Sequence, residues 1–97
     1  MYARVVMVEV QSGRMDDAIS IVKDSILPAA QQEEGFKGYL LLTNTETNKV
    51  INITIWETEA AMTAGEASGY YQEQVAKVAS TFAGKPAMEH YQVSVQD

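Results

Sequence analysis

The sequence predicts an α+β fold whose elements follow the order strand, helix, strand, strand, helix, strand. Four short segments alternate apolar and polar residues at a period of two, which is typical of strands. Two longer segments repeat apolar residues at helical spacing and separate the first strand from the second and the third from the fourth. The 97 residues contain no linker and no internal repeat, so we expect one domain over residues 1–97.

The first predicted strand covers residues 2–10. One of its faces carries three valines after Arg4, and the other face is also largely apolar: Val6, Val8 and Val10 on the first, Ala3, Val5 and Met7 on the second. Apolar residues on both faces favour a central strand that is covered on both sides. We assign no chemistry to Arg4 and expect it to pair with an acidic side chain.

A first helix is predicted over residues 14–34, after the turn at Ser12-Gly13. Its apolar stripe is spaced as in an amphipathic helix and consists of Met15, Ile19, Val22 and Ile26. Pro28 lies inside the pattern and removes one backbone hydrogen bond, so we expect a kink near residues 25–27. Gly35 is suited to end the helix.

The next two strands, residues 36–43 and 50–57, form a predicted antiparallel hairpin. The connection at residues 45–48 ends in Asn48, which tolerates the left-handed conformation that such a turn needs. The second strand has the strongest strand pattern in the chain, and we expect its isoleucine face to be the core face: Ile51, Ile53 and Ile55. Its other face, with Asn52, Thr54 and Trp56, is half polar and predicts the wall of a pocket.

The second helical region is predicted as two pieces, residues 59–67 and 69–82, with Thr58 as the N-cap. The last strand covers residues 87–95, with Tyr91, Val93 and Val95 on its apolar face and Met88, His90 and Gln92 opposite. The complete order, β-α-β-β-α-β, predicts a ferredoxin-like, four-stranded antiparallel sheet with the helices on one face.

Helices on one face leave the other face of the sheet uncovered. We expect this face to carry Val5, Met7, Thr54, Trp56, Met88 and His90. A large exposed apolar patch usually marks an interface or a ligand site. The sequence therefore predicts a homodimer that forms through the sheet faces, with a cavity between or beside them.

Composition excludes several classes of function. The net charge is −6, from 13 acidic and 7 basic residues, and the bases are scattered singly, so neither nucleic acid nor a membrane surface is an expected partner. There is no cysteine and only one histidine, so we expect no metal site. The N-terminal segment lacks the unbroken apolar centre of a signal peptide, and no apolar run would span a membrane, which fits the cytoplasm.

Motifs over nearly the whole chain resemble one known family. They are Gly35-Phe36-x-Gly38-Tyr39, Val50 followed by Trp56-Glu57-Thr58-x-Ala60, Tyr70-Tyr71, Gly84-Lys85-Pro86 and Glu89-x-Tyr91-x-Val93. Together they resemble the antibiotic biosynthesis monooxygenase domain family. The resemblance implies a dimeric α+β barrel. It does not fix an activity, because the family includes quinol and anthrone monooxygenases and haem-degrading enzymes.

The resemblance implies roles for particular residues. Asn52 and Trp56 match a pair that binds substrate in such enzymes, and both carry neutral N–H donors able to stabilise a substrate oxyanion. Met62 and Ala76 stand where the tyrosine and arginine of such sites are expected. The second helix lacks the axial histidine of the haem-degrading relatives, which disfavours haem.

Two further residues are candidates from their chemistry. His90 shares the predicted face of Trp56 and is the one side chain with an ordinary pKa near neutrality, so it is the candidate catalytic base. Tyr70 is a candidate substrate-binding residue, because it begins a helix beside the predicted pocket. The alternative role is packing in the core or at a dimer interface for Trp56 and packing for Tyr70. For Asn52 it is a solvated or strand-edge amide, and for His90 a surface or interface histidine.

Two functions remain open from the sequence. One is a cofactor-independent monooxygenase that acts on a quinol-like or polyketide-type aromatic. The other is a non-catalytic protein of the same fold that binds a small hydrophobic ligand. An isomerase of small ring compounds is possible on the same scaffold, although no particular residue indicates it.

Overall fold

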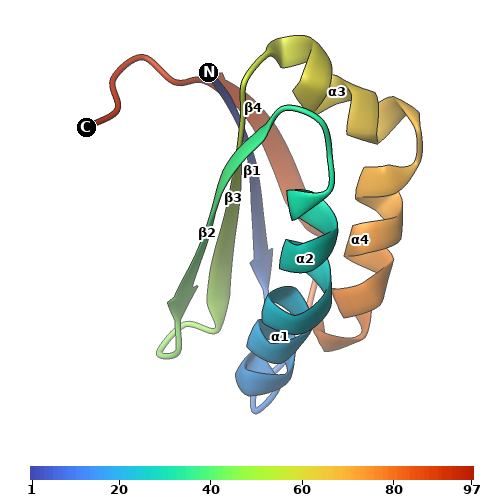
Figure 1. The fold of residues 1–97 in the computed structure, drawn as a ribbon. Helices are drawn as coiled ribbons and strands as arrows, with labels where there is room; N and C mark the ends of the chain where they lie inside the picture. The colour runs from blue at the N-terminus through green and yellow to red at the C-terminus, as the bar shows by residue number, and fades with distance from the viewer.

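The structure is a computed structural model that describes residues 1–97. Its strands are β1 (Tyr2–Glu9), β2 (Phe36–Asn44), β3 (Lys49–Trp56) and β4 (Ala87–Gln92). Its α-helices are α1 (Met15–Ile21), α2 (Leu27–Gln31), α3 (Glu59–Ala67) and α4 (Tyr70–Val78); a π-helix, Val22–Ile26, joins α1 to α2, and a 3-10 turn, Ala79–Thr81, follows α4. The predicted order of elements is confirmed (Figure 1).

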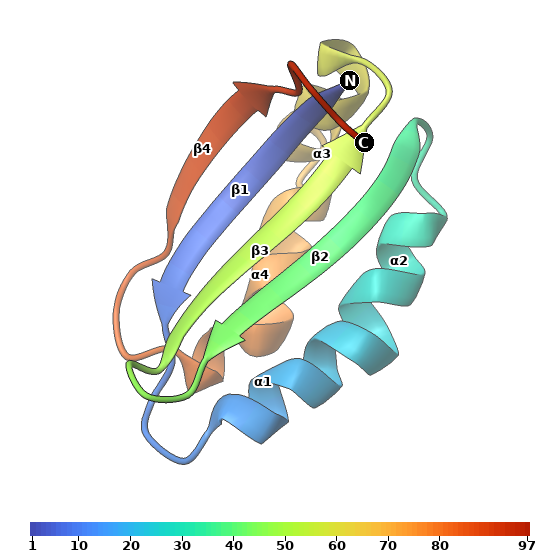
Figure 2. The ribbon, with the colours of Figure 1, turned by 90° about the vertical axis from the view of Figure 1, so that its left-hand side faces the viewer.

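The four strands form one antiparallel sheet in the order β2-β3-β1-β4. All helices lie on one face of this sheet. No helix covers the other face, and only the C-terminal segment crosses it near one end, as the view onto the strands shows (Figure 2). This is the ferredoxin-like α+β arrangement that the sequence predicts. The central strands are β3 and β1, so the residues of these two strands reach deepest into the space beneath the helices.

The predicted disturbance near Pro28 takes the form of a change in hydrogen bonding. The N–H of Leu27 bonds to the carbonyl oxygen of Val22, five residues back, whereas an α-helix bonds four residues back. Proline cannot donate to the preceding turn, and the wider π-turn accommodates its ring while the helical path continues into α2 (Figure 1). Val22 and Ile26 both remain buried.

Two turns have the conformations that their residues predict. Asn48, at the end of the β2–β3 connection, has a φ of 59°. Gly35, between α2 and β2, has a φ of 84°, and a Cβ at this position would lie 2.6 Å from the Cβ of Ala61 in α3. Only glycine fits there, since both the backbone conformation and the close approach of α3 exclude a side chain.

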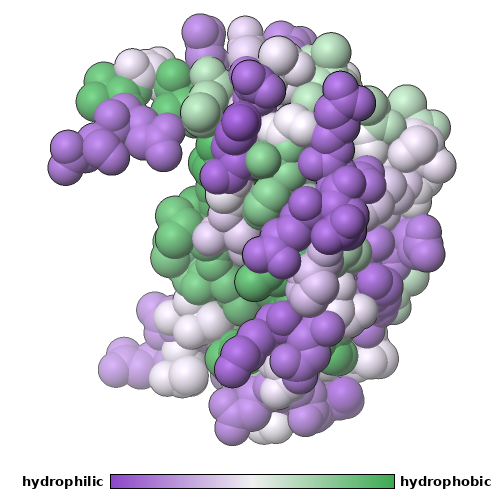
Figure 3. Space-filling model, viewed as in Figure 1, coloured by the Kyte–Doolittle hydropathy of each residue, from purple (hydrophilic) through white to green (hydrophobic).

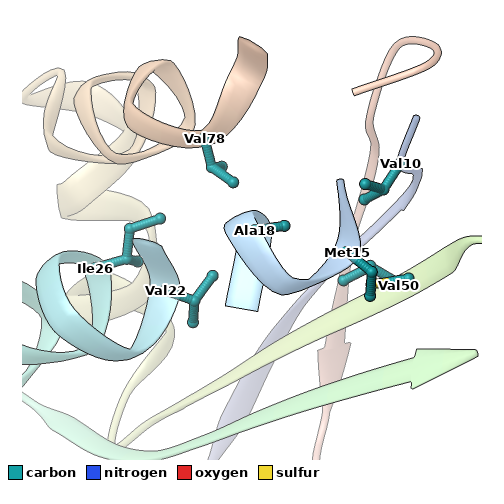
Figure 4. Close-up of a cluster of buried hydrophobic side chains, with 7 residues drawn as sticks. All are labelled: Val10, Met15, Ala18, Val22, Ile26, Val50 and Val78. Atoms are coloured by element: carbon teal, nitrogen blue, oxygen red, sulfur yellow. The ribbon is translucent and has the colours of Figure 1, made fainter. Parts of the chain in front are cut away.

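A cluster of aliphatic side chains fills one end of the layer between the sheet and the helices (Figure 4). It joins the end of β1 and the start of β3 to α1, the π-helix and α4, through Val10, Met15, Ala18, Val22, Ile26, Val50 and Val78. All seven side chains are buried. We call these residues the aliphatic end.

The prediction about the faces of β3 is wrong. The face with Asn52, Thr54 and Trp56 points toward the helices, and Thr54 and Trp56 are buried. Arg4 lies opposite both Thr54 and His90 in the sheet, which places Met88 and His90 on this helix-facing side as well. The predicted location of these residues on the uncovered face is therefore also wrong.

The isoleucine face of β3 is the uncovered one. Ile51 and Ile53 lie opposite Met7 and Val5, which occupy the uncovered face as predicted. A period of two separates two faces but does not reveal which face a helix covers. The more apolar face of β3 predicts the core, whereas in the structure the polar residues of its other face surround an interior cavity.

The uncovered face is apolar over much of its area. Leu40, Leu42 and Tyr91 project from it with side chains 54%, 46% and 48% exposed. In the space-filling view, hydrophobic atoms gather along the left side, between the C-terminal tail and the β2–β3 turn (Figure 3). None of the helices has the length and apolar character needed to cross a membrane.

Candidate functional site

An interior cavity of about 80 Å³ lies between the sheet and the helices. This volume is several times the roughly 10–15 Å³ that one water molecule needs, and it is small beside the roughly 300–1,000 Å³ of most ligand pockets. Most of its lining is aliphatic, but polar and aromatic side chains gather toward one end: Arg4, Tyr39, Asn52, Thr54, Trp56, Tyr70 and Tyr71. We call these seven residues the polar end.

The change from aliphatic to polar runs along the two central strands. On the helix-facing side of β1, Arg4 lies near the N-terminus of the strand, and three valines come after it: Val6, Val8 and Val10. On β3, Val50 is followed by Asn52, Thr54 and Trp56. Because the two strands are antiparallel neighbours, their polar ends meet at the same end of the sheet.

Asn52 is held by a neighbouring tyrosine. The Tyr39 hydroxyl, from β2, donates a hydrogen bond to Oδ1 of Asn52. Burial raises the pKa of Tyr39 to about 12, although the hydrogen bond to Asn52 acts in the opposite direction, so the hydroxyl stays protonated near neutral pH. With its oxygen occupied, Asn52 presents the amide N–H₂ as the group available to a ligand in the cavity.

Trp56 is a wall of the cavity whose N–H is already bonded. Its side chain is 1% exposed, and Nε1 donates to Oγ1 of Thr54 at 2.9 Å. The Phe36 ring packs edge-on against it, with ring centroids 5.8 Å apart. Trp56 therefore offers a ligand the face of a fixed indole, and its N–H reaches a ligand only by leaving Thr54.

Arg4 brings a buried positive charge to the polar end. Its side chain is 4% exposed, and the guanidinium lies 5.4 Å from the ring centroid of Trp56 and 4.7 Å from that of Tyr71. Nη1 donates to the carbonyl oxygen of Met62 and to Oε2 of Glu66, each at 3.1 Å. These contacts fix the guanidinium in place against α3 and α4.

His90 lies behind this arginine and outside the cavity lining. Its Nε2 is 2.7 Å from Oε2 of Glu66, the oxygen that also accepts from Arg4. A carboxylate is only an acceptor, so Nε2 carries the proton of this hydrogen bond. The structure thus places His90 on the same side of the sheet as Trp56 but does not bring it to the ligand space.

Tyr70 and Tyr71, at the start of α4, both line the cavity. Burial raises the pKa of Tyr70 to about 12, with a further contribution from Glu33, and burial also raises the pKa of Tyr71. Tyr70 packs closely on Gly65 of α3, where an added Cβ would lie 3.1 Å from its ring. Both phenols are therefore neutral near pH 7 and act as donors or packing surfaces.

The structure brings together three of the four residues predicted for the site, Asn52, Trp56 and Tyr70, and leaves His90 outside. Sequence reasoning missed Arg4 and Tyr39. The signal for Arg4 was present, because a lone arginine begins an otherwise valine-lined face of a central strand, and such a charge needs buried partners. No group of three or more histidine, aspartate or glutamate side chains is arranged to hold a metal ion.

Comparison with known families identifies the group to which the chain belongs. The sequence pattern of the family described as "Antibiotic biosynthesis monooxygenase" matches residues 1–77. The chain belongs to this family. The match covers every strand and helix that contributes to the polar end.

Solved structures share the fold. A Bordetella bronchiseptica protein described as a candidate antibiotic biosynthesis monooxygenase is 25% identical, with a TM-score of 0.82, and the match covers 97% of each chain. A Streptomyces coelicolor monooxygenase from the gene ActVA-Orf6, solved with the ligand nanaomycin D, has a TM-score of 0.76 at 17% identity over 99% of this chain and 89% of that one. At that identity the likeness shows the fold alone.

Curated relatives are longer than this chain. The Mycobacterium tuberculosis (H37Rv) proteins Rv2557 and Rv2558, both described as uncharacterized, are 33% and 32% identical. The matches cover 96% and 97% of this chain but only 41% and 39% of those proteins. The chain therefore spans about two fifths of the length of these relatives.

Proposed function

We propose that the chain is a monooxygenase domain that acts in the cytoplasm on a small electron-rich aromatic, without a flavin or metal. The observation that carries this proposal is the interior cavity, which combines an aromatic wall, Trp56, with the free amide N–H₂ of Asn52. The family membership supports the reaction class.

The reaction requires little of the protein beyond binding and electrostatics. A hydroquinone that has lost a proton is electron-rich enough to reduce O₂, and the balanced outcome is hydroquinone plus O₂ giving hydroxyquinone plus water. Asn52 would stabilise the phenolate oxygen, and the apolar lining would shelter the intermediate from water. Neither histidine nor acid lines the cavity, so the phenol proton would leave to water.

One assay tests this proposal directly. We expect O₂ uptake above buffer when the protein is mixed with a panel of hydroquinones and anthrones, without added flavin or metal. Asn52→Leu should abolish the uptake, because it removes the donor while keeping the size of the side chain. Trp56→Phe, which keeps an aromatic ring, should reduce it less. No uptake with any member of the panel would refute the monooxygenase.

The second candidate is a domain that binds such a ligand without reacting. The specific observation in its favour is the absence of any histidine, aspartate or glutamate from the cavity lining. Ligand binding measured by the fluorescence of Trp56, together with no O₂ uptake, would favour this candidate.

We also propose that the chain forms a homodimer through the uncovered sheet face. Its exposed leucines, its isoleucines and Tyr91 form an apolar surface that is unusual for a monomer. We expect sedimentation of a dimer at micromolar concentration, and dissociation of this dimer in Ile53→Lys. A wild-type monomer under these conditions would contradict the proposal.

A further inference from the structure

Arg4 has one edge of its guanidinium unused. The structure assigns both of its side-chain hydrogen bonds to Nη1, and no protein group accepts from Nε or Nη2. The side chain is nonetheless 96% buried and lines the cavity. A buried guanidinium with free N–H groups beside an interior cavity is a ready partner for an oxyanion, which it binds in a planar, two-point manner.

The one charge in the cavity lining is positive, opposite in sign to the net charge of the protein, and Glu66 pairs with it from outside the lining. The chain carries 13 acidic and 7 basic residues, yet Arg4 is the one charged side chain in the cavity lining. Tyr39, Tyr70 and Tyr71 have a raised pKa and add no negative charge near pH 7. A cavity that excludes acids in an acidic protein favours an anionic ligand.

A groove next to the cavity continues this pattern. It lies between β2 and the π-helix region and shares part of its lining with the cavity, including Val22, Tyr39 and Leu41. The one charged residue that lines the groove is Lys23. Lys23 is exposed, so it adds a second positive charge close to the cavity that also attracts an anion.

The size of the cavity limits the ligand. A space of about 80 Å³ accommodates a single aromatic ring more readily than a fused three-ring system. Trp56 and Tyr71 line the cavity and lie beside the Arg4 guanidinium, so a planar ring packed against their rings can place its charged group near the guanidinium.

We propose that the cavity selects a single-ring aromatic anion of the benzoate type, whose carboxylate binds the free edge of Arg4. The inference rests on the proposed function, since it names the ligand class of the same cavity. Glu66 lowers the affinity of the site for an anion, because its carboxylate binds the same guanidinium as the ligand.

Binding measurements with two matched probes test the inference. Benzoate and benzyl alcohol have similar size but differ in charge, and the fluorescence of Trp56, the single tryptophan, reports binding in the cavity. We expect benzoate to bind wild-type protein about tenfold more tightly, which corresponds to about 1.4 kcal/mol. Equal or tighter binding of benzyl alcohol would overturn the inference.

Substitutions of Arg4 and Glu66, which form an ion pair, should change benzoate binding in opposite directions. Arg4→Met should remove the preference for benzoate, whereas Glu66→Gln should strengthen benzoate binding severalfold and leave benzyl alcohol unchanged. If Arg4→Met fails to fold, Glu66→Gln still decides, because its amide keeps an oxygen to accept from Arg4. If the Arg4–Glu66 pair had only a structural role, both variants would bind benzoate more weakly than the wild type. That result would contradict the inference.

Two controls separate this inference from the proposed reaction. Lys23→Gln should slow the association of benzoate at low salt more than that of benzyl alcohol, since Lys23 lies at the groove and not in the cavity. A preference for benzoate without any O₂ uptake would refute the reaction but support the anion site. Uptake with equal rates in wild type and Arg4→Met would support the reaction and refute the anion site.

Discussion

The aliphatic end and the polar end belong to the same layer between sheet and helices, and the same strands, β1 and β3, contribute to both. At the aliphatic end, Val10 and Val50 pack against α1 and α4 with no polar group among them. At the polar end, Arg4, Asn52 and Thr54 occupy the equivalent positions further along these strands. The first end obtains its stability from close packing, and the second satisfies buried polar groups through specific hydrogen bonds.

This difference explains how a small domain accommodates a cavity. Each polar group that is sealed from solvent at the polar end has a hydrogen-bond partner. The partners come from several elements: Thr54 for Trp56, Tyr39 for Asn52, and Glu66 for Arg4. The aliphatic end needs no such partners, because its side chains only pack the helices onto the sheet and line the rest of the cavity.

The largest expected effect on stability is at the aliphatic end. Met15→Ala should lower the free energy of unfolding by about 2–5 kcal/mol, because it removes a buried side chain and leaves a cavity. The Met15→Ala molecules that remain folded should still bind a ligand at the polar end. Urea denaturation followed by circular dichroism measures the change.

Met88→Ala is the matched control, since Met88 is 39% exposed on the edge strand and should cost well under 1 kcal/mol. An equal loss of unfolding free energy in Met15→Ala and Met88→Ala would contradict the conclusion that the aliphatic end is the main source of stability.

The next effect concerns the contact that closes the loop before β2. Gly35→Ala should destabilise the fold more than Gly13→Ala, by about 1–3 kcal/mol. Both glycines have a φ near 84°, but only the new Cβ at Gly35 meets a neighbour, Ala61 at 2.6 Å. The difference between the two variants in thermal or urea denaturation isolates this contact. Equal destabilisation would show that α3 moves away at little cost.

A smaller effect is expected from the hydrogen bond that positions Asn52. Tyr39→Phe removes the donor and should cost about 1 kcal/mol of unfolding free energy. It should also weaken ligand binding, because the Asn52 amide loses its fixed orientation. Tyr91→Phe, on the uncovered face, is the control and should preserve binding. A Tyr39→Phe protein with unchanged ligand affinity would show that Asn52 needs no positioning.

The last effect is absent near neutral pH and appears only at alkaline pH. The pKa of Tyr39 and of Tyr70 is raised in the folded state, from 10.0 to about 12, so folding favours the neutral phenols. Their contribution to stability is complete below pH 10 and is lost as the pH rises toward 12. The free energy of unfolding should therefore decline over this range, and the decline should be shallower in Tyr39→Phe than in wild type. Identical slopes would contradict burial as the cause.

Much of the fold was predictable because its signals are local. The alternation in β1 and β3, the Thr58 cap, the Asn48 turn and the effect of Pro28 each depend on a few neighbouring residues. It was also predicted that Asn52, Trp56 and Tyr70 line one cavity, the first two from the family resemblance and Tyr70 from its position at the start of a helix.

The choice of covered face was not predictable in the same way. Ile51, Ile53 and Ile55 form the more apolar face of β3, yet the helices cover Asn52, Thr54 and Trp56. The polar face can be buried because Tyr39, from another strand, donates to Asn52 and Trp56 donates to Thr54, while α3 supplies the partners of Arg4. Alternation within one strand contains no information about those partners, and the site's one charge, on Arg4, was overlooked for the same reason.

The most direct test of the account is the NMR signal of the Trp56 indole N–H during titration with a single-ring aromatic anion such as benzoate. Because the chain has one tryptophan, this signal is unambiguous. We expect a saturable shift of this signal together with the Asn52 side-chain amide, larger than any shift of the methyl groups of Val50 and Val78, which line the other end of the cavity. Saturable shifts confined to those methyl groups, or to Ile53 on the uncovered face, would contradict the polar end as the ligand site.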